Sequence, residues 1–142
     1  YNDSTINGFS HNRLSGTGCC DYGDVLLMPT VGEQCIGTEE PTGQQMPYCS
    51  SFSHDDEVAV PGYYSVYLSR YGVRAELTAT CRAAIHRYTY PATSGAGMIL
   101  DLDYSLQRQT NRDMLIEQVN DSTLTSLCAS TWSFRVPSPS GW

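Results

Sequence analysis

Hydrophobic and polar residues alternate most clearly in the middle of the chain. Between Val73 and Thr80, every second residue is apolar and the residues between them are charged or carry a hydroxyl. A period of two is typical of an antiparallel strand with one buried face. The Tyr- and Val-rich segment Tyr63–Leu68 predicts a preceding strand, and residues 69–72 have the composition of a turn. We therefore predict a β-hairpin over residues 63–80.

Other short apolar segments, punctuated by Pro and Gly, predict further strands. They are Val25–Met28, which Pro29 closes, Ala84–Tyr90 and Met98–Leu102, with weaker candidates at Leu115–Val119 and Leu124–Leu127. Gly32–Ser51 is rich in Gly, Pro, Gln and Thr and is expected to be a long loop. No helical stripe of useful length interrupts this pattern. Short strands at close spacing favour an all-β fold, an antiparallel β-sandwich.

Length and charge set limits on the domain organisation and on the partners. The chain has 142 residues, so we expect a single domain over 1–142. Its net charge is −7, and all eight cations are Arg, without a basic cluster, which argues against nucleic acid as a partner. No segment approaches the roughly 18 apolar residues of a membrane span. Because the chain opens at Tyr1, without a signal peptide or initiator Met, we expect a processed start or a piece of a longer polypeptide.

The cysteines predict an oxidising compartment. Six cysteines in this length, without CxxC spacing, favour disulfides over zinc and a secreted, extracellular or periplasmic location. Cys35 and Cys49 flank the loop rich in Pro and Gly and are the preferred pair, although six cysteines leave the connectivity open. Asn2 and Asn120 begin Asn-Asp-Ser triplets and are candidate glycosylation sites.

The segment between Gly8 and Thr30 carries the densest candidate chemistry. A His, an Arg, hydroxyl residues, glycines and carboxylates precede an apolar strand, a composition that suits a surface loop approaching a polar ligand or another domain. Its polar side chains could bind sugar hydroxyls or a neighbouring domain. From these residues alone, the alternative is a structural loop whose polar groups satisfy its own turns.

Other polar residues have a structural interpretation beside a functional one. The carboxylates of His54-Asp55-Asp56-Glu57 could bind a hard cation or serve glycoside hydrolysis, but a solvated acidic turn is the preferred interpretation. Asp101 and Asp103 are interpreted as edge or turn carboxylates, and His86 as a packed sheet residue.

Four segments, in order along the chain, resemble a known family. Residues 8–30 read GFSHNRLSGTGCCDYGDVLLMPT, and residues 52–68 and 71–91 follow with FSHDDEVAVPGYYSVYL and YGVRAELTATCRAAIHRYTYP. A fourth similarity covers parts of residues 97–111. Together these segments resemble the N-terminal domain of the glycoside hydrolase family 92 α-mannosidases over residues 8–122. Residues 123–142 are interpreted as a divergent tail.

The resemblance implies a fold for this chain and separate roles for two domains. It implies a β-sandwich, of the galactose-binding or supersandwich kind, packed on a larger helical catalytic domain; here the sandwich is expected to be partial. Family enzymes are calcium-dependent, inverting exo-α-mannosidases whose acid, base and calcium ligands lie in the catalytic domain. No catalytic or metal residue and no cofactor is therefore assigned to this chain, which is expected to be inactive alone. The resemblance places the first loop at the interface of the two domains, and the residues transferred to that interface are His11, Arg13, Ser15, Gly16, Thr17 and Gly18.

Three functional hypotheses follow. The first is a non-catalytic domain that shapes the mannoside pocket and packs on a catalytic domain of the same or a companion chain. The second is a stand-alone extracellular β-sandwich, a structural or assembly subunit that self-associates through open sheet edges. The third is a lectin-like module that binds α-mannoside glycans.

Overall fold

The computed structural model describes residues 2–11, 25–33, 45–102, 104 and 112–130. The strands and the one short helix of this part are β1 (Thr5–Ile6), β2 (Leu26–Val31), β3 (Ser50–Ser51), η1 (His54–Asp56), β4 (Val58–Val60), β5 (Tyr63–Leu68), β6 (Val73–Ala79), β7 (Ala84–Thr89), β8 (Ala96–Asp101), β9 (Arg112–Asn120) and β10 (Thr123–Ser130). Within these residues, no helix has the length and apolar character needed to cross a membrane.

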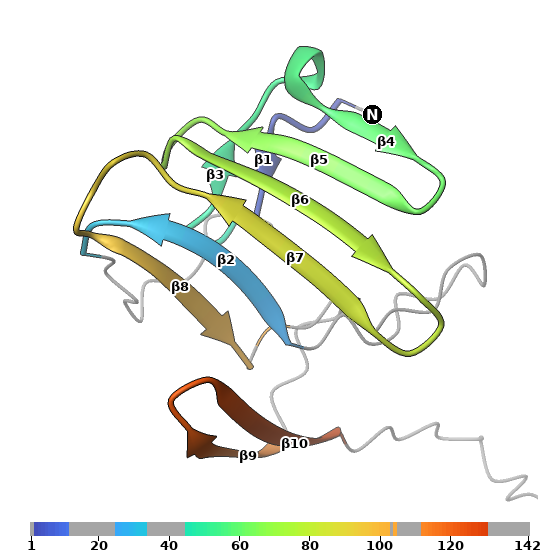
Figure 1. Cartoon of the computed structure of the whole chain (residues 1–142), viewed down its shortest axis with the longest axis vertical. Helices are drawn as coiled ribbons and strands as arrows, with labels where there is room; N and C mark the ends of the chain where they lie inside the picture. The colour runs from blue at the N-terminus through green and yellow to red at the C-terminus, as the bar shows by residue number, and fades with distance from the viewer. Residues whose placement is uncertain (1, 12–24, 34–44, 103, 105–111, 131–142) are drawn as a thin grey trace, which may run out of the picture.

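The largest sheet has the order β4-β5-β6-β7 and is antiparallel throughout (Figure 1). The predicted hairpin is its centre: Leu68 pairs with Val73 across the turn, and Val66 pairs with Ala75. All four of these side chains are fully buried. The alternation along β6 therefore has the physical cause that the sequence indicated, because one face of the strand is excluded from water.

A second sheet pairs β2 with β8, and here the predicted strand end was wrong. Pro29 does not close the strand but lies inside β2, opposite Met98, and the strand continues to Val31. The N–H of Leu27 donates to Phe9, on the edge of β2 away from β8. N–H groups two residues apart point to the same edge of a strand, so the N–H that Pro29 lacks would point, like that of Leu27, away from β8. The proline therefore removes no hydrogen bond between β2 and β8.

The two sheets enclose one core. Buried side chains from β2, β5, β6 and β8 meet there with aromatic side chains from the connecting segments. The core residues are Phe9, Leu26, Met28, Tyr48, Val66, Leu68, Tyr71, Val73, Ala75, Leu77 and Ile99. Two antiparallel sheets that face each other across an apolar layer form a β-sandwich, which confirms the predicted all-β fold.

The remaining strands form two small sheets. β1 pairs with β3, and β9 pairs with β10 in a hairpin that Figure 1 draws beyond the end of β8. Leu115, Ile116, Val119 and Leu124 of this hairpin are exposed. The weaker strand predictions at 115–119 and 124–127 are confirmed. Part of the predicted tail, Thr123–Ser130, is the second strand of the hairpin.

Candidate functional site

β7 carries two polar aromatic side chains on the core face of the four-stranded sheet. His86 pairs with Leu77 of β6, which pairs with Tyr64 of β5, so these three residues form one row across the sheet. Tyr88 belongs to the next row, opposite Ala75. Because partners in a row lie on the same face, His86 and Tyr88 continue the buried face of β6 towards its rim. Both are half-buried.

Phe9 covers these rows. Its N–H donates to the carbonyl of Leu27 at 2.8 Å, and its carbonyl accepts from the N–H of Leu27 at 2.9 Å, which ties the segment to β2. The buried Phe9 ring lies 6.3–6.4 Å, between ring centroids, from the rings of Tyr64, His86 and Tyr88. The segment leading to His11 is therefore anchored to both sheets of the sandwich.

Gly8 makes this close approach feasible. Its φ is +150°, a backbone conformation that side-chain-bearing residues rarely adopt. A Cβ at this position would lie 2.7 Å from the Leu26 Cγ and 2.7 Å from the Leu27 carbonyl oxygen. The first glycine of the family-like segment is thus required by contact with β2.

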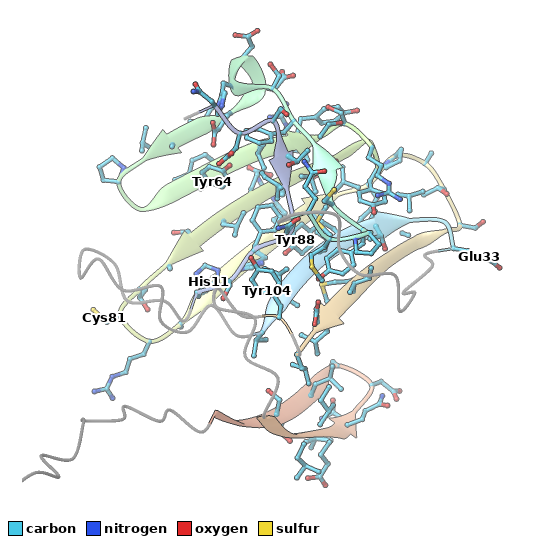
Figure 2. All side chains as sticks on the ribbon, turned by 180° about the vertical axis from the view of Figure 1, so that it is seen from behind. His11, Glu33, Tyr64, Cys81, Tyr88 and Tyr104 are labelled. Carbon is cyan, nitrogen blue, oxygen red and sulfur yellow. The ribbon has the colours of Figure 1, made fainter. Side chains whose placement is uncertain are left out.

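His11 reaches the sheet at His86. The two Nε2 atoms are hydrogen-bonded, and the imidazole centroids are 4.6 Å apart. The other ring nitrogen of His86, Nδ1, is bonded to the Tyr88 hydroxyl at 2.6 Å. His11, Tyr64 and Tyr88 are labelled in Figure 2, which views the structure from behind. We call Phe9, His11, Tyr64, His86 and Tyr88 the His11 cluster.

The surroundings favour uncharged forms of this cluster. Burial, and secondarily the neighbouring His11, lower the pKa of His86 below its usual value of 6.5. Burial is also the main reason that the pKa of the Tyr88 hydroxyl is raised. Near neutral pH the Tyr88 hydroxyl and the imidazole of His86 are therefore both neutral, and each can donate and accept a hydrogen bond.

Tyr64 connects the His11 cluster to the acidic turn. Its hydroxyl donates to Glu57 Oε1 at 2.7 Å, and Glu57 Oε2 lies 2.5 Å from Nδ1 of His54. Both hydrogen bonds lower the pKa of Glu57, and the bond from Tyr64 has the larger effect. Asp55 and Asp56 are exposed, as a solvated acidic turn requires, whereas Glu57 is held in this network.

Asp101 is more than an edge carboxylate. It ends β8, is half-buried, accepts from the hydroxyl of the buried Tyr48, and accepts from the N–H of Tyr104 at 3.0 Å. The hydroxyl of Tyr71 donates to the carbonyl of Tyr48 at 2.8 Å. This network fixes the core-lining segment around Tyr48, so Asp101 has a structural role.

Most of the predicted site residues lie outside the part of the chain that the structure describes. Of the interface set, only His11 lies within the described residues. Arg13, Ser15, Gly16, Thr17 and Gly18 lie outside them, as do Cys35 and Asp103.

The cysteine and glycosylation candidates stay predictions. Cys49 is a half-buried free thiol in the structure, and its proposed partner Cys35 is not described. Asn2 is exposed near the start of the chain, and Asn120 is exposed at the turn between β9 and β10. Among the described side chains, no group of three or more His, Cys, Asp or Glu residues could hold a metal ion.

Sequence reasoning missed the pairing of His86 with His11. His86 does lie in the sheet, half-buried, but it also binds the loop residue that the sequence singled out. A signal was present, because Ala84, His86 and Tyr88 alternate with Ile85 and Arg87 along one strand. Polar aromatic residues at the core-facing positions of a strand indicate a partner that reaches them.

Comparison with known proteins identifies the family. The model of the glycosyl hydrolase family 92 N-terminal domain matches residues 1–137. This range is wider than the 8–122 suggested by the segments quoted above. A comparison with curated proteins finds no match.

Two solved structures of one enzyme are similar to this chain. The family GH92 α-mannosidase BT3965 from Bacteroides thetaiotaomicron is 42% identical, with a TM-score of 0.77 over 89% of this chain and 17% of that chain. Its complex with mannoimidazole gives 40% identity and a TM-score of 0.74 over 89% and 16% of the two chains. The chain therefore spans about one sixth of the length of that enzyme. With the matched family model and the β-sandwich described above, the chain belongs to glycosyl hydrolase family 92, within its N-terminal domain.

Proposed function

We propose that this chain is the non-catalytic N-terminal part of an α-mannosidase, where it packs on a catalytic domain and shapes the pocket for an α-mannoside glycan. The observation that carries the proposal is the similarity of nearly the whole chain to a small part of an α-mannosidase. A second structure of that enzyme holds mannoimidazole. No observation favours the stand-alone structural subunit or the lectin-like module over this proposal.

The His11 cluster gives the proposal a physical basis. Phe9 and Gly8 fasten the chain to the sandwich immediately before His11, and His11 itself is exposed. Precise sites depend on rigid support, and these contacts supply it directly before His11. Imidazole and hydroxyl groups beside aromatic rings also suit the polar and apolar faces of a sugar.

Calcium and the cellular compartment extend the same proposal. The calcium that the family resemblance implies would be held by the catalytic domain, where the resemblance also places the calcium ligands. Export to an extracellular or periplasmic compartment is supported by the six cysteines. Mass analysis of the protein purified from its natural source, with and without reduction, tests this part of the proposal.

The decisive experiment substitutes His11 in the natural polypeptide that contains these residues. We expect His11→Ala to lower kcat/KM for an α-mannoside by about ten- to a hundredfold, because a small misplacement of a pocket wall has effects of that size. The midpoint of thermal unfolding should stay nearly constant, since His11 is exposed.

Arg87→Ala is the matched control. Arg87 is exposed and binds Glu76 at 2.5–2.7 Å, on the face of the sheet opposite His86. Its replacement should leave kcat/KM unchanged. Unaltered hydrolysis by the His11→Ala protein would contradict a role for this loop in the pocket, and absence of any mannosidase activity in the natural polypeptide would contradict the function itself.

A further inference from the structure

We infer that His86 and Tyr88 are positioning residues for His11: their hydrogen bonds fix the orientation and tautomer of the His11 imidazole. The inference concerns two residues of β7, of which the sequence analysis interpreted His86 as a packed sheet residue. The link from His11 to a sugar pocket rests on the proposed function, whereas the hydrogen bonds that join Tyr88, His86 and His11 do not depend on it.

Tyr88, His86 and His11 form a hydrogen-bonded series, and only two distributions of its protons satisfy both bonds. One proton lies between the two Nε2 atoms, because two bare nitrogens or two N–H groups would repel each other. If the Tyr88 hydroxyl donates to Nδ1 of His86, then Nε2 of His86 donates to His11. If Nδ1 donates to Tyr88 instead, His11 is the donor. In both cases Tyr88 and His86 together determine which nitrogen of His11 carries the proton.

The support behind His11 is rigid. Tyr88 and His86 belong to β7, whose pairing with β6 runs from Arg74–Thr89 to Ala79–Ala84. The buried Phe9 ring packs edge-on against His86 and tilted against Tyr88. The rings of His86 and Tyr88 also meet edge to face, with their centroids 5.7 Å apart. The imidazole of His86 is thus held by Phe9 and Tyr88, and His11 is the exposed end of the hydrogen-bonded series.

Among the described residues, few titratable groups face His86. His11 faces it from the N-terminal segment, Tyr88 from its own strand, and Tyr64 from β5 beyond Leu77. Glu57 and His54 lie on the far side of Tyr64. Protonating both imidazoles would bring two positive charges into contact, so a second proton breaks the bond between them. The positioning of His11 should consequently weaken in acid.

Histidine-selective nitrogen NMR of the chain tests the inference. The chain has three histidines, so His54 serves as an internal reference. Near pH 7.5 we expect a single tautomer for His11 and for His86. His86 should titrate below its usual pKa of 6.5.

Two variants test the positioning directly. Tyr88→Phe keeps the ring but removes the hydroxyl, and it should shift the tautomer ratios of both His86 and His11. His86→Gln should leave His11 as a mixture of tautomers. Tyr90→Phe is the matched control, because the Tyr90 hydroxyl donates to the Gly97 carbonyl at 2.7 Å and lies outside the cluster. Unchanged methyl signals of Val66 and Leu68 would verify that each variant is folded.

The outcomes separate this inference from the proposed function. Identical His11 signals near pH 7.5 in the wild type, Tyr88→Phe and His86→Gln proteins would overturn the inference. If the signals shift as expected, the positioning stands. Hydrolysis of an α-mannoside by the natural polypeptide carrying Tyr88→Phe then tests the function separately: a changed pH profile supports the pocket role of His11, and an unchanged profile contradicts that role alone.

Discussion

The hairpin β5–β6 and the hairpin β9–β10 share antiparallel pairing and apolar residues but differ in burial. Val66, Leu68, Val73 and Ala75 of the first hairpin have no exposed surface. In the second hairpin, Leu115 is 62% exposed and Leu124 is 56% exposed. The first hairpin forms the wall of a core, whereas the second shields little of its apolar surface within the described part of the chain.

The distribution of apolar residues between the two faces explains the difference. In β6 the apolar residues occupy one face, and Arg74, Glu76 and Thr78 occupy the other. In β9, Leu115 and Val119 share a face with Glu117, while Ile116 shares the opposite face with Gln118. A strand with one apolar face needs a single partner layer, whereas apolar groups on both faces remain partly exposed unless layers cover both.

The largest effect is expected from removing core volume. Leu68→Ala should lower the free energy of unfolding by about 2–5 kcal/mol, because it deletes buried methyl groups and leaves a cavity. Leu124→Ala deletes the same atoms from an exposed position and should cost less than about 0.5 kcal/mol. Urea unfolding of the two variants measures both values. Equal losses would contradict the division into a packed and an unpacked hairpin.

A glycine pair sharpens the comparison at the level of the backbone. Gly8→Ala should cost about 3 kcal/mol, because the unfavourable φ adds to the clash with Leu26 and Leu27. Gly62 has a φ of +81°, but a Cβ added there would meet no atom within 4 Å. Gly62→Ala should therefore cost only the backbone strain of about 1 kcal/mol.

Thermal unfolding of the two glycine variants gives the difference. A Gly62→Ala protein as unstable as Gly8→Ala would show that contact with β2 is unimportant. If the Gly8→Ala protein stays folded, the NMR signals of His11 should report whether the loop has lost its anchor.

The smallest effect concerns the network at η1. The pKa of Glu57 is lowered in the folded state, so the folded state favours its carboxylate. The resulting stabilisation is present above the ordinary pKa of 4.5 and is lost as the pH falls below it. Tyr64→Phe removes the hydrogen bond that lowers the pKa of Glu57 most. It should lower the free energy of unfolding by about 0.5–1 kcal/mol at pH 7.

The pH dependence of that cost provides the check. The free energies of unfolding of the wild type and of Tyr64→Phe should be compared at pH 7 and at pH 3. The difference between the two proteins should be smaller at pH 3. Tyr90→Phe is a suitable control, because the Tyr90 hydroxyl donates at 2.7 Å to the carbonyl of Gly97, which does not titrate. A gap that is independent of pH would contradict the charge-assisted bond to Glu57.

Some features of the site could be predicted and others could not. The loop residue His11 was identified from its segment, and the hairpin at 63–80 from strict alternation. Continuation of β2 through Pro29 was not predictable from composition, because a proline is acceptable only where its missing N–H faces away from the partner strand. The alternation in β7 indicates that His86 has a partner, but the bond joins residues 75 positions apart, and no local pattern identifies His11 as that partner.

The sequence by itself determined three strands of the largest sheet (β5, β6 and β7), the all-β class and the family, because alternation and sequence similarity are local or ordered along the chain. The tertiary structure decided which strands face each other across the core and which polar groups meet at its rim. Those pairings depend on closing long loops around one apolar layer, and this closure placed Phe9 over β7 and brought His11 to His86.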